Sequence, residues 1–161
     1  MTETEAFRRQ MPAPLAPRPL KLPEHLETTL PNGLGLVVVE DKRLPLISFR
    51  LAFRSGDAND PVDRPGLSDM MSSLLTEGTA KRNSRQIAEE VERFGTTLAV
   101  GSSSDFTTVA ASSLSVYSEE ILDLMADVTL NPSFPQNEVD LAREHQANAH
   151  PATGSADVFG F

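Results

Sequence analysis

The spacing of hydrophobic residues changes near residue 60 from every second position to every third or fourth, and this change constrains the fold most. Between residues 47 and 53, apolar side chains alternate with smaller or polar ones, which is the period of a half-buried strand. Between Pro65 and Glu77, apolar residues lie three or four positions apart, so they share one side of a helix that ends at Gly78. These residues are Leu67, Met70, Met71, Leu74 and Leu75. The chain therefore places a helix directly after a strand.

Further segments with the spacing of a strand or of a helix lie before and after this strand and helix. Asn32–Gly33 separates two β-prone runs, and an Asn-Gly pair in that position predicts a tight hairpin. Strands are predicted at 27–30, 34–40, 96–102 and 106–112, and helices at 84–94, 118–130 and 138–149. Ser84 is the predicted cap of the helix at 84–94. The helix at 118–130 has a predicted buried stripe of Ile121, Leu124, Met125 and Val128. Their order predicts an α+β fold in which helices pack on one face of a mixed, mainly antiparallel sheet.

Length and composition predict one folded domain at 27–149, between a Pro-rich disordered tail at 1–26 and an unstructured end at 150–161. The 14 Lys and Arg residues against 23 Asp and Glu residues give a formal net charge of −9, which argues against nucleic-acid binding. No apolar run approaches the roughly 20 residues of a membrane span. The absence of cysteine excludes a thiolate zinc site. Because MTETEAFRRQ lacks the features of a secretory signal, the chain as written is expected in the cytoplasm, and in the periplasm or outside the cell if the true start lies upstream.

The helix predicted at 65–77 also carries polar residues at helical spacing. Asp69, Ser72, Ser73 and Thr76 fall on a second stripe, which could line a groove or face water. Met70 and Met71 belong to the apolar stripe and are predicted to pack in the core. On the next helix, the polar residues Glu89, Glu90 and Glu92 are predicted to form a solvated face.

Four blocks in a fixed order carry a family resemblance. They are NGLGLVVVEDKRLPLISFRLAFRSGDANDP, PGLSDMMSSLLTEGT, SRQIAEEVERFGTTLAVGSSSDFTTVAASSLS and LMADVTLNPSFP. Together they resemble the amino-terminal domain of the insulinase and pitrilysin metallopeptidases, to which the mitochondrial processing peptidases belong. The resemblance covers about residues 27 to 145, and the chain is shorter than a complete family domain, so it is expected to be truncated.

The resemblance implies where catalytic residues would stand. In active members the PGL block runs on into His-x-x-Glu-His, which holds zinc and supplies the general base. This pattern places Asp69 at the first His, Ser72 at the Glu and Ser73 at the second His, while the third ligand, a Glu on a later helix, falls near Ala149. Because these residue types cannot replace the motif, the resemblance implies no catalytic residue, no metal ligand and no cofactor.

The three histidines do not supply an obvious substitute. His145 and His150 lie five residues apart, which on a helix turns them about 140° from each other, so each is read as a solvent-facing polar residue. His25 falls in the Pro-rich tail and is expected to have no partner.

Family members that lack the zinc motif act as partner subunits, so the resemblance implies a non-catalytic subunit that assembles with an active zinc-peptidase homologue. Such a subunit would support the binding of unfolded peptide, for example by strand addition at the sheet edge. Two alternatives remain open: a truncated remnant without independent function, and a zinc metalloendopeptidase with altered ligands.

Overall fold

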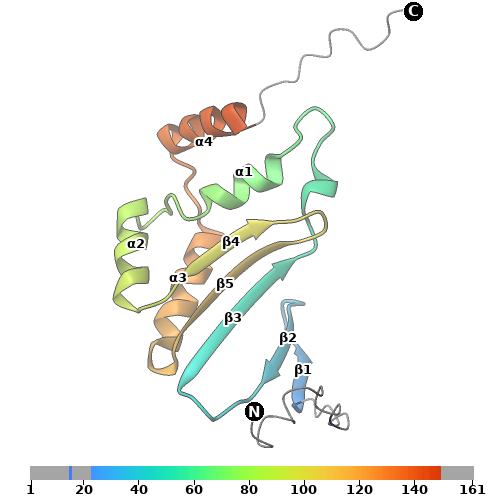
Figure 1. Cartoon of the computed structure of the whole chain (residues 1–161), viewed down its shortest axis with the longest axis vertical. Helices are drawn as coiled ribbons and strands as arrows, with labels where there is room; N and C mark the ends of the chain where they lie inside the picture. The colour runs from blue at the N-terminus through green and yellow to red at the C-terminus, as the bar shows by residue number, and fades with distance from the viewer. Residues whose placement is uncertain (1–14, 16–22, 150–161) are drawn as a thin grey trace, which may run out of the picture. The chain divides into compact units, whose positions relative to one another are not determined.

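The computed structural model describes residue 15 and residues 23–149, which belong to two compact units, Met1–Arg43 and Leu44–Phe161. In the first unit, strands β1 (His25–Thr29) and β2 (Gly35–Val39) form an antiparallel hairpin (Figure 1). Its turn is closed by the amide of Gly33, which donates to the carbonyl of Leu30 at 2.9 Å, and Gly33 adopts a positive φ of 86°. The predicted hairpin is therefore confirmed.

One prediction for this unit is wrong. His25 belongs to strand β1 and not to a tail, and its Nε2 lies 3.3 Å from Oε1 of Glu27. Residues two apart on a strand point to the same face, which brings the two side chains together. His25 therefore has a partner.

The second unit alternates strands and helices. In chain order its elements are β3 (Leu46–Phe53), η2 (Asp57–Asn59), α1 (Leu67–Leu74), α2 (Ser84–Arg93), β4 (Leu98–Ser102), β5 (Thr107–Leu114), η3 (Ser115–Tyr117), α3 (Ser118–Leu130) and α4 (Gln136–Ala149). All the helices and strands predicted for this part of the sequence are present. Helix α1 is shorter than the predicted 65–77, so Thr76 lies beyond its end.

Strand β5 is the middle strand of a three-stranded sheet with the order β3-β5-β4. Leu51 and Val100 both pair with Val109, so these three side chains share one face of the sheet. Every strand pairing among the described residues is antiparallel. The predicted α+β class with a mainly antiparallel sheet is confirmed, and the parallel pairs of a mixed sheet do not occur in this part of the chain.

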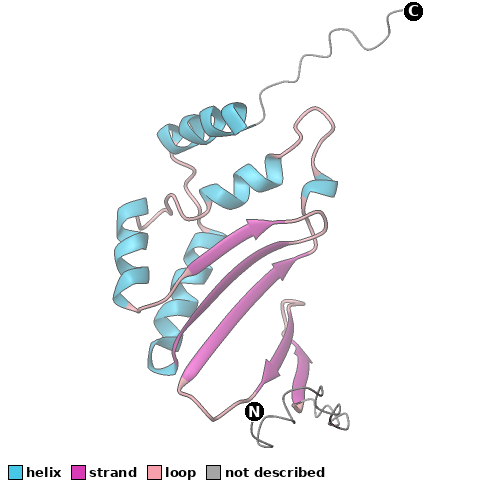
Figure 2. Cartoon of the chain, viewed as in Figure 1, coloured by secondary structure: helices cyan, strands magenta, loops and turns pink. Residues whose placement is uncertain are grey.

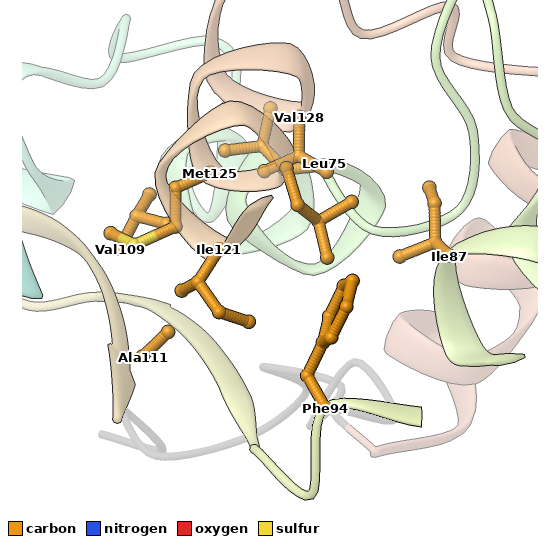
Figure 3. Packing of buried hydrophobic residues seen from close by; sticks show 9 residues of the cluster. Leu75, Ile87, Phe94, Val109, Ala111, Ile121, Met125 and Val128 are labelled. Carbon is orange, nitrogen blue, oxygen red and sulfur yellow. The ribbon is translucent and has the colours of Figure 1, made fainter. Parts of the chain in front are cut away.

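The core lies between that sheet face and the helices. Helix α3 runs along the sheet (Figure 2), and its predicted stripe of Ile121, Leu124, Met125 and Val128 is at most 3% exposed. Val109 from β5 is fully buried against it (Figure 3). Helix α2 adds Ile87, and the ring of Phe94 at its end lies 5.4 Å from the ring of Tyr117, centroid to centroid, in a tilted arrangement. The helices therefore cover one face of the sheet, as predicted.

The cap of α2 differs from the prediction. Asn83 caps the helix, because its Oδ1 accepts from the amide of Gln86 at 2.9 Å while Gln86 Oε1 accepts from the amide of Asn83 at 2.9 Å. Ser84 instead donates its hydroxyl to Oε2 of Glu77 at 2.8 Å. The reciprocal pair satisfies two amides of the first turn, which one serine could not do.

A partly buried ion-pair network joins the segment after α1 to helices α2 and α3. The guanidinium of Arg82, 17% exposed, contacts Glu90 at 3.1 Å, Asp123 at 3.1 Å and Asp127 at 2.6 Å. The prediction that Glu90 lies on a solvated face is therefore wrong, because the residue is half-buried against Arg82. These hydrogen bonds, with Glu90 as the largest contributor, raise the pKa of Arg82.

Asp127 is the most buried member of this network. Burial by itself raises the pKa of the Asp127 carboxyl, but hydrogen bonds from Thr79 at 2.8 Å and from Arg82 outweigh burial, so the pKa lies below its ordinary value. The carboxylate is therefore held in its charged form and fixes the loop that follows α1.

Candidate functional site

Helix α1 is positioned by a carboxylate from outside the helix. Oδ1 of Asp60 accepts from the amide of Ser68 at 3.0 Å and from its hydroxyl at 2.6 Å. These hydrogen bonds, of which the one from the hydroxyl has the largest effect, lower the pKa of the Asp60 carboxyl below its ordinary value. Gly66 begins the helix with a φ of 83°, and Gln146 of α4 donates to its carbonyl at 3.3 Å. Asp60 therefore takes the place of a local cap, a role the sequence analysis missed because no local cap pattern marks it.

The three positions of the expected zinc motif do not form one open face. Asp69 and Ser73 are exposed, whereas Ser72 is 2% exposed and lies on the buried side with Ser68. The hydroxyl of Ser72 donates to the carbonyl of Asp69 at 2.8 Å, and that of Ser73 donates to the carbonyl of Met70 at 2.8 Å. The predicted polar stripe is therefore split between the interior and the surface.

These residues do not fit zinc. Zinc sites in proteins use thiolate, imidazole and carboxylate ligands, of which this helix offers a single carboxylate, Asp69. The two serine hydroxyls already donate to backbone carbonyls. Among residue 15 and residues 23–149, no group of three or more His, Asp or Glu side chains is arranged to hold a metal ion.

A cavity of about 490 Å³ lies between α1 and α4. Asp69 and Ser73 line it from α1, and Glu138, Leu141 and His145 line it from α4. The predicted exposure of His145 is confirmed, and its imidazole shares this cavity with the serine and the aspartate. No hydrogen bond joins these three side chains in the described part of the chain, where Ser73 is bonded to its own helix instead. The residue types of a nucleophilic triad are present without the bonds that activate one.

A second cavity, of about 550 Å³, lies on the other side of the contact between α1 and α4 and is mainly apolar. Leu67, Met71, Phe134 and Val139 line it. Met71 also packs against the core, as predicted. The same prediction is wrong for Met70, which is half-buried between the two cavities and does not pack against that core cluster. The two cavities show that α4 leaves open space on both sides of α1.

The third-ligand position falls at the end of α4. Ala149 is the last residue of that helix, and an alanine methyl group cannot bind zinc. His150 lies outside the described residues. No helix in the described part of the chain is both long and apolar enough to cross a bilayer.

Comparison with known proteins gives consistent matches. Residues 36–153 match the family insulinase (peptidase family M16). The chain is 26% identical over 125 residues to a probable mitochondrial-processing peptidase subunit beta of Arabidopsis thaliana, and 25% identical over 105 residues to a non-peptidase homologue of Helicobacter pylori. These alignments cover 78% and 65% of this chain but 24% of each relative.

A solved structure shares the fold. A peptidase M16 inactive domain from Pseudomonas fluorescens superposes with a TM-score of 0.74 at 26% identity, over 79% of this chain and 31% of that one. The chain therefore spans less than a third of the length of these three proteins.

Proposed function

Because the chain belongs to the insulinase family (peptidase family M16), we propose that it is a non-catalytic member of that family, which supports peptide binding and assembles with an active zinc-peptidase homologue. The observation that carries the proposal is the state of the motif positions. Ser72, at the position of the general base, is buried and bonded to the carbonyl of Asp69, and Ser73, at a ligand position, is bonded to the carbonyl of Met70. Asp69, Ser72 and Ser73 then have no catalytic role.

Relatives in this family support the assembly part of the proposal. Two similar proteins are named as different subunits, beta and alpha-2, of mitochondrial-processing peptidases, so proteins of this kind occur as unlike subunits. A non-peptidase homologue and an inactive domain are also among the similar proteins. A chain without the zinc motif that keeps the fold fits the non-catalytic half of such a pair.

The sheet supports the peptide-binding part. Strands β3 and β4 are the two outer strands of the order β3-β5-β4, and helix α1 packs against β4 (Figure 1). An outer strand offers backbone amides and carbonyls to an extended peptide and needs no catalytic side chain. Peptide binding of this kind would survive the loss of the zinc motif.

Co-expression with a family member that carries His-x-x-Glu-His tests the proposal. We expect the two chains to purify together, zinc to follow the partner alone, and peptide cleavage by the partner to rise in the presence of this chain. Separate elution of the two chains together with unchanged cleavage would refute the assembly role. Zinc bound by this chain alone, with peptide cleavage, would instead support a metalloendopeptidase with altered ligands.

Urea unfolding of the chain alone addresses the remaining alternative. A cooperative transition would show that the chain folds independently and would argue against a remnant without function.

A further inference from the structure

Helix α4 is joined to the rest of the second unit through a single residue. The segment before it is tied to the loop after α1, because the amide of Ser133 donates to the carbonyl of Gly78 at 3.0 Å. Pro135 is tied to α4 itself, because its carbonyl accepts from the amide of Val139 at 3.0 Å. Phe134 lies between these two anchored parts, so a rotation of its backbone would move α4 as one piece.

Phe134 has a strained backbone conformation. Its φ of 44° is the only positive φ outside glycine among the described residues. A residue with a Cβ is disfavoured in this left-handed region, and a residue that precedes proline favours extended backbone instead. Such strain persists only where the surrounding structure holds it in place. The observed position of α4 is therefore opposed at the residue that joins the helix to the domain.

Few contacts hold α4 in that position. The helix packs against α1, on the side away from β4 (Figure 1). From residue 136 to residue 146 none of its residues is buried, and one hydrogen bond reaches the start of α1, from Nε2 of Gln146 to the carbonyl of Gly66 at 3.3 Å. The cavities of about 490 and 550 Å³ lie on either side of the contact between the helices. Gln146 is therefore a weak latch on a helix that has room to move.

We infer that α4 is a hinged lid on α1, with Phe134 as its hinge and Gln146 as its latch. In the arrangement described above the lid is closed, at a cost in backbone strain at Phe134. Release of Gln146 lets Phe134 return to a negative φ, and α4 then swings away from α1. Because both cavities have α1 and α4 as walls, this one rotation enlarges them together and exposes Met70, which lines both. The lid is a property of this chain alone and does not rest on the peptide-binding role proposed above.

Distances between two spin labels, measured by double electron–electron resonance, report the position of α4. The chain has no cysteine, so labels attach only where a cysteine is introduced. Glu92→Cys on α2 and Glu144→Cys on α4 place one label on each side of the hinge, at exposed positions. We expect a major distance from the closed lid and a minor one from the open lid. The control pair Glu92→Cys, Glu119→Cys joins α2 to α3 and should give one narrow distance in every variant.

Two kinds of variant test the latch and the hinge separately. Gln146→Ala removes the latch and should raise the minor population about two- to tenfold, as expected for the loss of one hydrogen bond. At the hinge, Phe134→Asn and Phe134→Leu both shorten the side chain, but asparagine tolerates a positive φ. Phe134→Asn should therefore keep the lid closed more often than Phe134→Leu. Packing in the apolar cavity would give the reverse order, because leucine is the more apolar of the two.

The outcomes decide the inference. A larger minor population in Gln146→Ala, with Phe134→Asn more closed than Phe134→Leu, would support the lid. A single narrow distance between α2 and α4 that Gln146→Ala leaves unchanged would overturn it, as would the reverse order of the two hinge variants. Broadening of the control distance would also overturn it, because the whole unit would then loosen in place of α4 alone. The peptide-binding role is tested separately by the co-expression experiment.

Discussion

Ser72 and Ser73 are adjacent serines in the expected zinc motif, and the structure predicts opposite responses to the same substitution. Ser72 is 2% exposed, while Ser73 is exposed and lines the cavity of about 490 Å³ between α1 and α4. Both hydroxyls bond to the carbonyl three residues earlier, each at 2.8 Å. Ser72→Glu and Ser73→Glu therefore remove equivalent hydrogen bonds and differ in burial.

The magnitude follows from that burial. Ser72→Glu forces a longer side chain into packed space, which costs about 1–3 kcal/mol. The unpaired buried carboxylate adds several kcal/mol, so a total loss of about 4 kcal/mol is expected. Ser73→Glu should change the free energy of unfolding by no more than about 0.5 kcal/mol.

Urea unfolding followed by far-ultraviolet circular dichroism measures both values, since the chain has no Trp and a single Tyr for fluorescence. With a slope of about 2 kcal/mol per molar urea, Ser72→Glu should lower the midpoint by about 2 M and Ser73→Glu by about 0.25 M or less. Equal midpoints for the two variants would refute the assignment of Ser72 to the buried side of α1.

Restoring the whole motif should therefore fail. The triple variant Asp69→His, Ser72→Glu, Ser73→His places the glutamate at the buried position, and it is expected to lack a third ligand, because the position expected for that ligand lies near Ala149. We expect no zinc-dependent peptide cleavage and reduced stability. Measurable zinc-dependent hydrolysis by this variant would contradict the reasoning.

Three further predictions concern the elements that hold the site. Gly56→Ala should destabilise the chain by about 2–3 kcal/mol, because a Cβ there would overlap a loop carbonyl, whereas Gly101→Ala meets nothing within 4 Å and serves as the control in urea unfolding. Asn83→Ala should cost about 1 kcal/mol and lower the thermal midpoint, since it removes the cap of α2. Asp127 has a lowered pKa in the fold, so the unfolded chain binds its proton more tightly and stability should fall as the pH drops below about 4. Asp127→Asn should weaken that dependence in urea titrations between about pH 3 and 6, and an unchanged dependence would assign it to other carboxyls.

The spacing of hydrophobic residues along the sequence was enough to predict the helices and strands. Helix α3 shows why: its stripe of Ile121, Leu124, Met125 and Val128 must be buried together, and the structure buries all four. The hairpin of β1 and β2 likewise follows from local turn chemistry. Elements specified by neighbours in sequence can be read from the sequence.

Contacts between residues far apart in sequence could not be predicted in this way. Asp127 belongs to the polar side of α3, yet it is buried. Its charge is compensated there by Arg82, which lies 45 residues away in the sequence. Ser72 lies on a polar stripe by helical spacing, yet it is buried because a small side chain lets α1 pack closely against its neighbours. The cavity of about 490 Å³ could likewise not be predicted from the sequence, because it forms only where α1 and α4, which are distant in sequence, face each other.

The same arrangement separates the stability of the second unit from the proposed peptide binding. Its core lies between the sheet and α2 and α3, and it is fixed on the α1 side by Asp60 and Arg82. Helix α4 contributes no buried residue between Gln136 and Gln146, so it lines the cavity of about 490 Å³ beside α1 but adds little to the core. Substitutions on the exposed side of α4 should therefore leave the core intact. A chain without the zinc motif could therefore keep this core and still differ in the peptide it is proposed to bind, because different residues would carry the two properties.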